Sequence, residues 1–354
     1  MAISTPCYTT REAVKRALDL KETARGDEQV DRAVESSARL IDKEAHRRFY
    51  PRDATRYFDW PNYQYAAPWK LWFGQWDLVS ATSVTSGGIV IPLAQVIFRP
   101  TNKEPWEPYT HLELDRSTTA AFAAGATPQN SIAIAGTWSY NAETAPAGLL
   151  AAAVASTTVT TVTVTDGSLL GVGDLAVIDG ERMLVTGRAA VTTGQANLSG
   201  ATTASAADNA AVVTDGTQVH VGEVLQIDSE RMLVEDVTGN VVTVKRGWDG
   251  TVLATHAGGT ALYSYRVLTV ARGQLGTPAA THLNGAVVLR HNPPPLIRDL
   301  NLAEALNQVL QETSGYSRTV GGGDTLMAAS GAGLADKWDE AMTAHGRRAR
   351  SRAI

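Results

Sequence analysis

The chain has 354 residues, of which 44% are hydrophobic and 19% are charged, and its formal net charge is −5. This length predicts two or more hydrophobic cores, and the composition excludes a disordered chain. The single cysteine, Cys7, excludes an internal disulfide framework and a cysteine-based zinc site, and the negative charge gives no general reason to bind nucleic acid or an anionic membrane. Because the sequence contains no apolar signal segment and no run of 18 apolar residues, we expect neither export by a signal peptide nor a membrane span.

The first 50 residues predict two helices. Thr9 and Glu12 form a capping-box pattern ahead of a short helix. Apolar residues then recur at spacings of three and four from Val30 to Ala45, which predicts a longer helix that ends before Pro51.

Residues 51–140 predict a small β-rich domain, because short apolar or alternating segments are separated by Gly, Pro and Asn. Nine aromatic residues fall between positions 57 and 76, out of 23 in the whole chain. A small core cannot bury them all, so we favour a subunit interface over a sugar-stacking platform for this stretch. The expected interface residues are Trp60, Tyr63, Tyr65, Trp69, Trp72 and Trp76.

Residues 141–157 predict a linker, and residues 158–290 predict an inserted all-β domain of repeated hairpin modules. The segment "GVGDLAVIDGERMLV" at 171–185 recurs as "HVGEVLQIDSERMLV" at 220–234, which indicates two copies of one supersecondary unit. Strand-forming Thr and Val flank both copies.

A second repeat pairs "RGWDGTVLATHAGG" at 246–259 with "RGQLGTPAATHLNG" at 272–285. A third, degraded copy is expected at 198–213, where the Arg and the His are lost. The strings lack the GKS or GKT ending of a phosphate-binding loop and follow a strand without opening a helix, so a nucleotide site is not expected.

The repeats carry residues that suit catalysis or metal binding. Asp179 with Glu181, and Asp228 with Glu230, place two carboxylates on one face of a strand, as an acid/base pair or a calcium site would need. We favour a structural interpretation, in which Asp-Gly supplies a tight turn and each His hydrogen-bonds a loop backbone. The residues assigned to structural turns are Asp179, Gly180, Gly250, His256, Gly276 and His282, and no catalytic, cofactor-binding or metal-binding residue is expected.

Residues 291–354 predict two C-terminal helices and a basic tail. Three prolines at 293–295 introduce an apolar stripe from Leu296 to Leu310, and a last helix is expected at about 333–348. The tail is expected to contact an acidic partner surface or DNA, although cations at a helix C-terminus also complement the helix dipole. The expected contact residues are Trp338, Arg347, Arg348, Arg350 and Arg352.

The order of these elements resembles the head-to-tail connector (adaptor) proteins of tailed bacteriophages. The resemblance covers about residues 8–140 and 293–350, and it rests on "TTREAVKRAL", the long second helix, the strands around "LWFGQWDLVSATSVTSGG" and "IAIAGTWSY", and the helix led by "PPPLIRDLNLAEALNQVL". It implies an α+β fold, in which the N-terminal and C-terminal helices form a helical core beside the small β-rich domain. The insertion at 158–290 departs from the compact pattern of the family, although its "RGxxGTxxATHxxG" string resembles one in β modules of other phage structural proteins.

The resemblance also implies a function. Such proteins are virion components without a catalytic centre or a cofactor, made in the host cytoplasm and located in the neck between head and tail. They form homo-oligomeric rings, here expected to be dodecameric, that bind the portal protein, extend the DNA channel and receive a downstream neck or tail-terminator protein. Contact with packaged DNA would be passive, and no membrane contact is expected.

Two alternatives stay open. The β insertion and the aromatic stretch would also suit a tail-associated module that binds a glycan or a host surface. A hydrolase acting through the paired carboxylates Asp179/Glu181 or Asp228/Glu230 is the weaker alternative.

Overall fold

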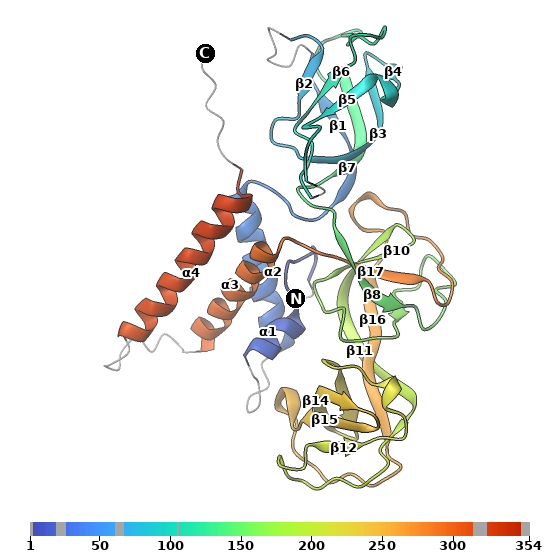
Figure 1. Ribbon diagram of the computed structural model, residues 1–354, viewed down its shortest axis with the longest axis vertical. Coiled ribbons are helices and arrows are strands. Elements are labelled where there is room, and N and C mark those ends of the chain that lie inside the picture. The colour runs from blue at the N-terminus through green and yellow to red at the C-terminus, as the bar shows by residue number, and fades with distance from the viewer. Residues whose placement is uncertain (1–2, 19–25, 61–66, 105, 314–323, 348–354) are drawn as a thin grey trace.

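A computed structural model describes residues 3–18, 26–60, 67–104, 106–313 and 324–347 of the chain. Three β-rich lobes follow one another along the long axis of the molecule, and four helices lie beside the middle lobe (Figure 1). We call the lobes the N-terminal β domain (residues 51–140), the first module (residues 144–192 and 264–291) and the second module (residues 193–263).

The N-terminal β domain combines two antiparallel sheets around its own core. The first sheet has the order β1-β7-β3-β4 and the second the order β2-β6-β5. Alternating side chains of β7 (Ile132–Trp138) are buried, as expected for a strand with one face on a core. The other strands are β1 (Arg52–Phe58), β2 (Lys70–Trp72), β3 (Leu78–Ser86), β4 (Ile89–Ile91), β5 (Val96–Arg99) and β6 (His111–Leu114).

The other two lobes share a ten-stranded sheet. Two long strands, β11 (Glu181–Asn197) and β16 (Ala261–Ala271), pair antiparallel and run through both lobes (Figure 1). The first module adds β8 (Thr144–Leu149), β9 (Thr161–Thr163), β10 (Leu175–Ile178) and β17 (Val287–His291). The second module adds β12 (Ala210–Val212), β13 (Val224–Ile227), β14 (Glu230–Thr238) and β15 (Val241–Lys245).

The two modules are copies of one unit, and the second is inserted into a hairpin of the first. In the first module Ile178 pairs with Glu181 across the β10–β11 hairpin, and in the second Ile227 pairs with Glu230 across the β13–β14 hairpin. In the second module β14 and β15 are consecutive strands that pair as a hairpin. The corresponding strands of the first module are the start of β11 and the end of β16, which also pair but are far apart in the sequence. The whole second module lies between these two segments.

This nesting corrects the expectation of a third repeat copy at 198–213. Leu198 bridges Val213 and Thr202 bridges His256, whereas Leu150 bridges Val164 and Val154 bridges His282. Residues 198–213 are therefore the counterpart of residues 150–164, the segment that opens the first module.

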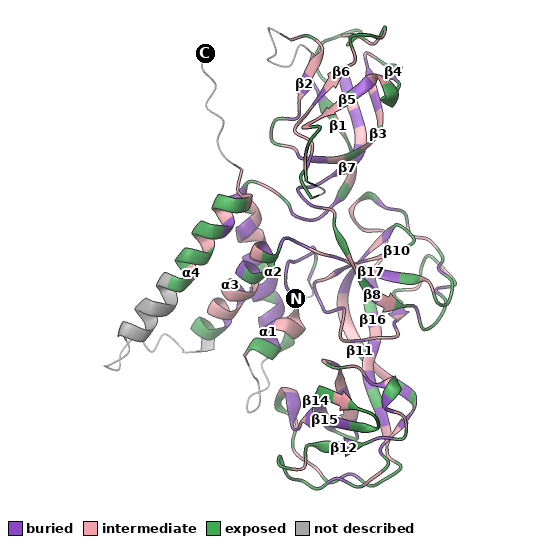
Figure 2. Ribbon diagram, in the orientation of Figure 1, coloured by how far each residue is buried: buried purple, intermediate pink, exposed green. Residues whose placement is uncertain are grey.

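The four helices of the described residues pack against one another, and α4 lies on the side away from the first module (Figure 1). They are α1 (Arg11–Ala17), α2 (Asp27–Ala45), α3 (Pro295–Thr313) and α4 (Asp324–His345). The buried amide of Asn301 on α3 joins them, because its oxygen accepts from the backbone N–H groups of Tyr8 and Thr9 while its nitrogen donates to Ser37 on α2. Figure 2 shows that the described part of α4 is exposed along most of its surface.

Helix α1 begins differently from the capping-box prediction. The N-cap is Thr10, whose hydroxyl accepts from the Ala13 N–H at 3.1 Å. Glu12 instead accepts from the backbone N–H of Val172 at 2.8 Å, so its carboxylate ties the helix to the first module.

The expected fold class, α+β with a helical adaptor core, is wrong. Strands hold 36% of the residues and helices 22%, and the large sheets are antiparallel. The helices do not close a core of their own, because Val34 of α2 and Ile297 of α3 belong to the same buried cluster as Met183 and Val288 of the first module. The repeats were expected to form an inserted domain beside a helical core, but α2 and α3 share a buried core with the first module.

None of the helices in the described part of the chain combines the length and the apolar character needed to cross a membrane.

Candidate functional site

The repeated charged residues of the second module meet in one buried cluster. Glu230 lies at the start of β14 and accepts from Arg246 through both carboxylate oxygens, with Nε and Nη2 each at 2.7 Å. The backbone N–H groups of Gly247 and Ala254 donate to the same carboxylate at 3.0 Å. The ring of His256 completes the cluster, with Nε2 at 3.0 Å from Glu230 Oε2.

Arg246 uses its whole guanidinium in this cluster. Nη1 donates to the carbonyl oxygens of Thr203 and Asp208, and Nη2 donates to Ala254 as well as to Glu230. Together with Nε, all five N–H donors of the fork therefore have acceptors. The cluster ties the turn after β15 to the loop that opens the second module.

The first module repeats this arrangement. Arg272 donates to Glu181 through Nε and Nη2 at 2.7 Å, and His282 Nε2 lies 2.9 Å from Glu181 Oε2. The carbonyl oxygens of Ser156 and Val159 take the place of those of Thr203 and Asp208. We call these two arrangements the Glu–Arg–His clusters.

Each histidine also reaches a second carboxylate. His256 Nδ1 lies 2.8 Å from Asp228 Oδ2, and His282 Nδ1 lies 2.9 Å from Asp179 Oδ2. Each imidazole ring therefore lies between two carboxylates. Asp179 has φ of 48° and the following Gly180 has φ of 87°, which places both in the tight turn between β10 and β11.

Electrostatics favour the ionised form of the two buried glutamates. Burial alone would raise the pKa of Glu181, but the hydrogen bonds from Arg272, the Ala280 N–H, His282 and the Gly273 N–H lower it to about 2. The equivalent donors around Glu230 lower its pKa to about 2 as well. The side chains of Glu181 and Glu230 are 1% and 0% exposed, so substrate has no access to either carboxylate.

These contacts limit what the clusters can do chemically. A general base needs a free lone pair within reach of substrate, whereas both imidazole nitrogens here face carboxylates and the rings are fully buried. Within the described residues, no group of three or more His, Cys, Asp or Glu side chains is arranged to hold a metal ion. The clusters fix loop geometry, but the expected hydrogen bond from each His to a loop backbone is wrong. The ring nitrogens bond carboxylates, and the Glu and Arg side chains make the contacts with the loop backbone.

The aromatic stretch lies in the N-terminal β domain. Trp60, Trp69 and Trp76 are half-buried against the core of that domain, whereas Tyr63 and Tyr65 lie outside the described residues.

Three of the tryptophans each carry a cation over the ring. Arg56 lies 3.3 Å from the ring centre of Trp76, Arg116 lies 4.4 Å from that of Trp69, and Lys70 lies 4.5 Å from that of Trp72. Trp72 also stacks on His111, with ring centres 4.0 Å apart. These rings therefore present cationic groups together with apolar area.

The described part of the basic tail contacts the chain itself. Arg347 donates to Asp77 at 2.7 Å and to the carbonyl oxygen of Gly74 at 2.9 Å, and its backbone N–H donates to Ala45. Arg47 also pairs with Asp77, at 3.2 Å. This joint connects the helices to the N-terminal β domain.

The other residues assigned to a portal or DNA contact lie apart from this joint or cannot be placed. Trp338 is half-buried on α4, and its Nε1 lies 3.3 Å from Glu304 of α3. Arg348, Arg350 and Arg352 lie outside the described residues.

The chain matches no family model, no curated protein and no solved structure.

Sequence reasoning noted Arg246 and Arg272 as repeated residues but assigned them no role. The sequence did contain a sign that these residues belong together. The Glu recurs in the repeat at 171–185 and 220–234, and the Arg and the His recur in the repeat at 246–259 and 272–285. The chain order is Glu181, Glu230, Arg246, Arg272, which is the order of a nested pair and not of a tandem pair.

Proposed function

We propose that this protein is a structural component of a tailed-phage particle, a head-to-tail adaptor that forms a homo-oligomeric ring between the portal protein and a downstream neck or tail protein. In this role the chain is a building block, and its surfaces carry the function.

The observation that supports this proposal most is the use made of the repeated polar residues. Glu181, Glu230, His256 and His282 are the groups best suited to chemistry in the repeats, and all four are buried in the Glu–Arg–His clusters. Because these side chains hold the loops of the two modules in place, they make the modules rigid, as a structural protein requires.

The surface of the N-terminal β domain supports a role in assembly. Four apolar side chains are exposed along the edge formed by β4, the following 3₁₀ turn η1 (Leu93–Gln95) and β5: Ile89 (66%), Val90 (65%), Leu93 (37%) and Ile97 (37%). Strand β4 is the last strand of its sheet, so one side of its backbone has no partner strand within the described residues. A subunit of a ring needs such self-complementary or head-to-tail surfaces.

Assembly is the experiment that tests the proposal. The purified chain should give a mass of many subunits in light scattering and a closed ring in negative-stain images, and it should co-sediment with portal protein. A double substitution Ile89→Glu and Val90→Glu should reduce the assembly to smaller species, because it places charges on the exposed edge. Val252→Glu is the matched control, since Val252 is 81% exposed in the second module.

The same experiments can also support the alternative, a tail-associated glycan-binding module. A stable monomer that binds polysaccharide and ignores portal protein would contradict the adaptor and indicate a tail-associated glycan-binding module.

A further inference from the structure

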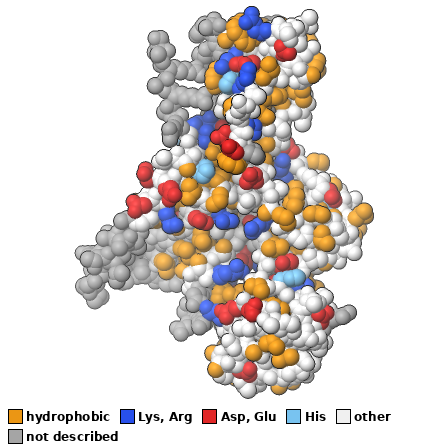
Figure 3. All heavy atoms as spheres, in the orientation of Figure 1, with side chains coloured by type: hydrophobic (Ala, Val, Ile, Leu, Met, Phe, Trp, Pro, Cys, Tyr) orange, Lys and Arg blue, Asp and Glu red, His pale blue; other side chains and the backbone are white. Residues whose placement is uncertain are grey.

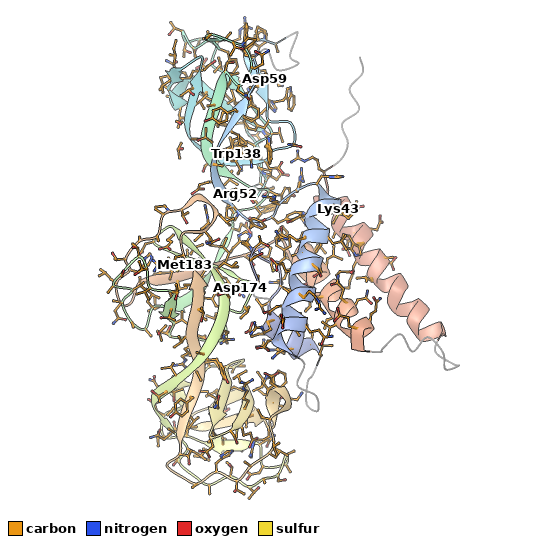
Figure 4. All side chains as sticks on the ribbon, turned by 180° about the vertical axis from the view of Figure 1, so that it is seen from behind. Lys43, Arg52, Asp59, Trp138, Asp174 and Met183 are labelled. Carbon is orange, nitrogen blue, oxygen red and sulfur yellow. The ribbon has the colours of Figure 1, made fainter. Side chains whose placement is uncertain are left out.

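A charged pocket of about 240 Å³ lies where α1 meets both modules. Figure 3 shows Lys, Arg, Asp and Glu side chains gathered where the middle of the molecule meets the second module. In the view from behind, Asp174, one of the lining residues, lies between the strands of the first module and the helices (Figure 4). Six Lys or Arg and four Asp or Glu residues line the pocket, so positive charge is in excess.

Three of the six cations pair with Asp side chains within the chain. Arg11 pairs with Asp31 at 2.6 Å, Lys15 pairs with Asp249 at 2.8 Å, and Arg231 pairs with Asp249 at 2.6 Å.

The other three are Arg16, Arg188 and Arg290. Arg16 donates to the carbonyl oxygen of Gly222 at 3.0 Å and Arg290 to that of Leu169 at 3.4 Å. Neither has an ion pair with a carboxylate of the described residues.

Arg188 is the most constrained of the three. Its side chain is 9% exposed, and Nη2 donates to the carbonyl oxygens of Gly167 and Tyr265. Nη1 forms an ion pair with the Glu12 carboxylate at 3.7 Å, although this distance is too long for a hydrogen bond. The buried Nε–H has no hydrogen-bond partner among the described residues, and an unsatisfied donor of a charged group is costly.

We propose that this pocket binds an oxyanion, a carboxylate or phosphate group, through Arg188, Arg16 and Arg290. Arginine forks match the planar or tetrahedral oxygens of these groups. The volume suits a small anion or one acidic side chain. The excess of lining cations disfavours a cationic ligand.

Asp174 opposes an anion in the same pocket. Its Oδ2 accepts from the Gly171 N–H at 2.8 Å, and burial raises the pKa of its carboxyl to about 6. In the second module the equivalent residue, Glu223, is held by Arg266 through two hydrogen bonds at 2.7 and 2.8 Å. Within the described residues Asp174 has no such arginine fork, so its carboxylate does not hold Arg290 by a hydrogen bond.

The oxyanion has two possible sources, a small solute or an acidic side chain of a second copy of this chain. The second source rests on the proposed ring, whereas the first does not. Two measurements on the full chain separate them: the melting temperature in sodium phosphate, sodium acetate and sodium chloride at equal ionic strength, and the assembled mass by light scattering.

If a small anion binds, phosphate or acetate should raise the melting temperature relative to chloride, because a ligand of the folded state stabilises it. Arg290→Met should require about tenfold more anion for the same rise, as expected for the loss of a charged hydrogen bond. Asp174→Asn should require roughly threefold less, because it removes a like charge and keeps the acceptor for Gly171. Arg298→Met is the control, since Arg298 lies half exposed on α3, away from the pocket.

If a second copy supplies the carboxylate, Arg290→Met should reduce the assembled mass while Arg298→Met leaves it unchanged. The proposal is overturned if the three salts give equal melting temperatures and Arg290→Met also assembles as the unmodified chain does. Anion binding by a chain that stays monomeric would support the pocket while contradicting the ring, so the two proposals fail separately.

Discussion

The 3₁₀ turns η3 (Trp248–Gly250) of the second module and η4 (Gln274–Gly276) of the first occupy equivalent positions but contact different parts of the molecule. Their central residues, Asp249 and Leu275, have nearly the same backbone, with φ of 56° in both and ψ of 39° and 36°. Asp249 binds Lys15 of α1, so η3 holds the second module against the helices.

Turn η4 contacts the N-terminal β domain instead. A Cβ atom on Gly276 would lie 2.1 Å from the carbonyl oxygen of Asp53, which explains why glycine is needed at this close approach. Arg182 pairs with Asp53 at 3.0 Å, whereas its counterpart Arg231 pairs with Asp249 of its own module. The same turn geometry therefore serves two contacts. In η3 the Asp249 side chain binds α1, whereas in η4 the close approach of Gly276 and the side chain of Arg182 contact Asp53.

The largest loss of stability is expected from a substitution that disrupts a Glu–Arg–His cluster. Glu230→Gln leaves Arg246 buried without its counter-ion and should cost about 3–5 kcal/mol of unfolding free energy. Because the second module has its own core, hydrogen exchange should rise in that module while the helices stay protected.

The equivalent substitution in the first module should increase hydrogen exchange over a larger part of the molecule. Glu181→Gln should expose amides in the helices as well, since they share a core with that module. Glu235→Gln, on the exposed face of β14, is the control for both variants. Equal exchange in the helices of the two variants would contradict the separation of the cores.

Acid should weaken both clusters together. The pKa values of Glu181 and Glu230 are about 2 when folded and ordinarily 4.5, so the unfolded chain binds protons first as the pH falls. The stabilisation is therefore complete above pH 4.5 and is lost as the pH falls towards 2, on the order of 3 kcal/mol for each glutamate. Urea unfolding at several pH values should show this slope, and the double variant Glu181→Gln, Glu230→Gln should flatten it.

A smaller effect is expected at the tip of turn η3. Asp249→Asn keeps a residue that tolerates positive φ but removes the charge that holds Lys15 and Arg231, and it should cost about 1–2 kcal/mol. Hydrogen exchange should increase in α1, at the contact between helices and second module. Leu275→Asn, the matched change in η4, should leave that contact unchanged; a rise in α1 exchange there too would show that the effect is not specific to η3.

The smallest effect is expected at the exposed ends of the clusters. Asp179 and Asp228 are each 59% exposed, and Asn at either position can still accept from the His Nδ1–H. Asp179→Asn and Asp228→Asn should each change stability by less than about 1 kcal/mol in urea unfolding. A loss as large as that of Glu230→Gln would show that the buried glutamates are not the main anchors.

Local sequence patterns predicted many elements but not how they combine. Periodicity placed the second helix near its observed span, Asp27–Ala45, and the Asp-Gly pair at 179–180 pointed to the turn between β10 and β11. The fold class was wrong because hydrophobic stripes show that a helix buries one face and not which element covers it. For α2 and α3 that element includes the first module.

The charged pocket had no local signal. Its six cations come from α1, β11, β14 and β17, and they meet where α1 lies against both modules. Pairings of this kind depend on tertiary contacts between segments that are far apart in the sequence. The Glu–Arg–His clusters were partly within reach of the sequence, since the order of the repeated charges already excluded two modules in tandem.

The nested insertion also decides how the molecule carries force. Strands β11 and β16 enter the second module as two continuous backbones, so tension along the long axis is borne by covalent bonds in both strands and need not break the hydrogen bonds between them. A two-stranded ribbon resists stretching and bends most easily out of its plane. The contacts of Lys15 with Asp249 and of Arg16 with Gly222 brace the second module against that bending on the side of the helices. The β11–β16 pair therefore connects the two modules by a link that resists stretching, and the contacts with α1 limit its bending on one side.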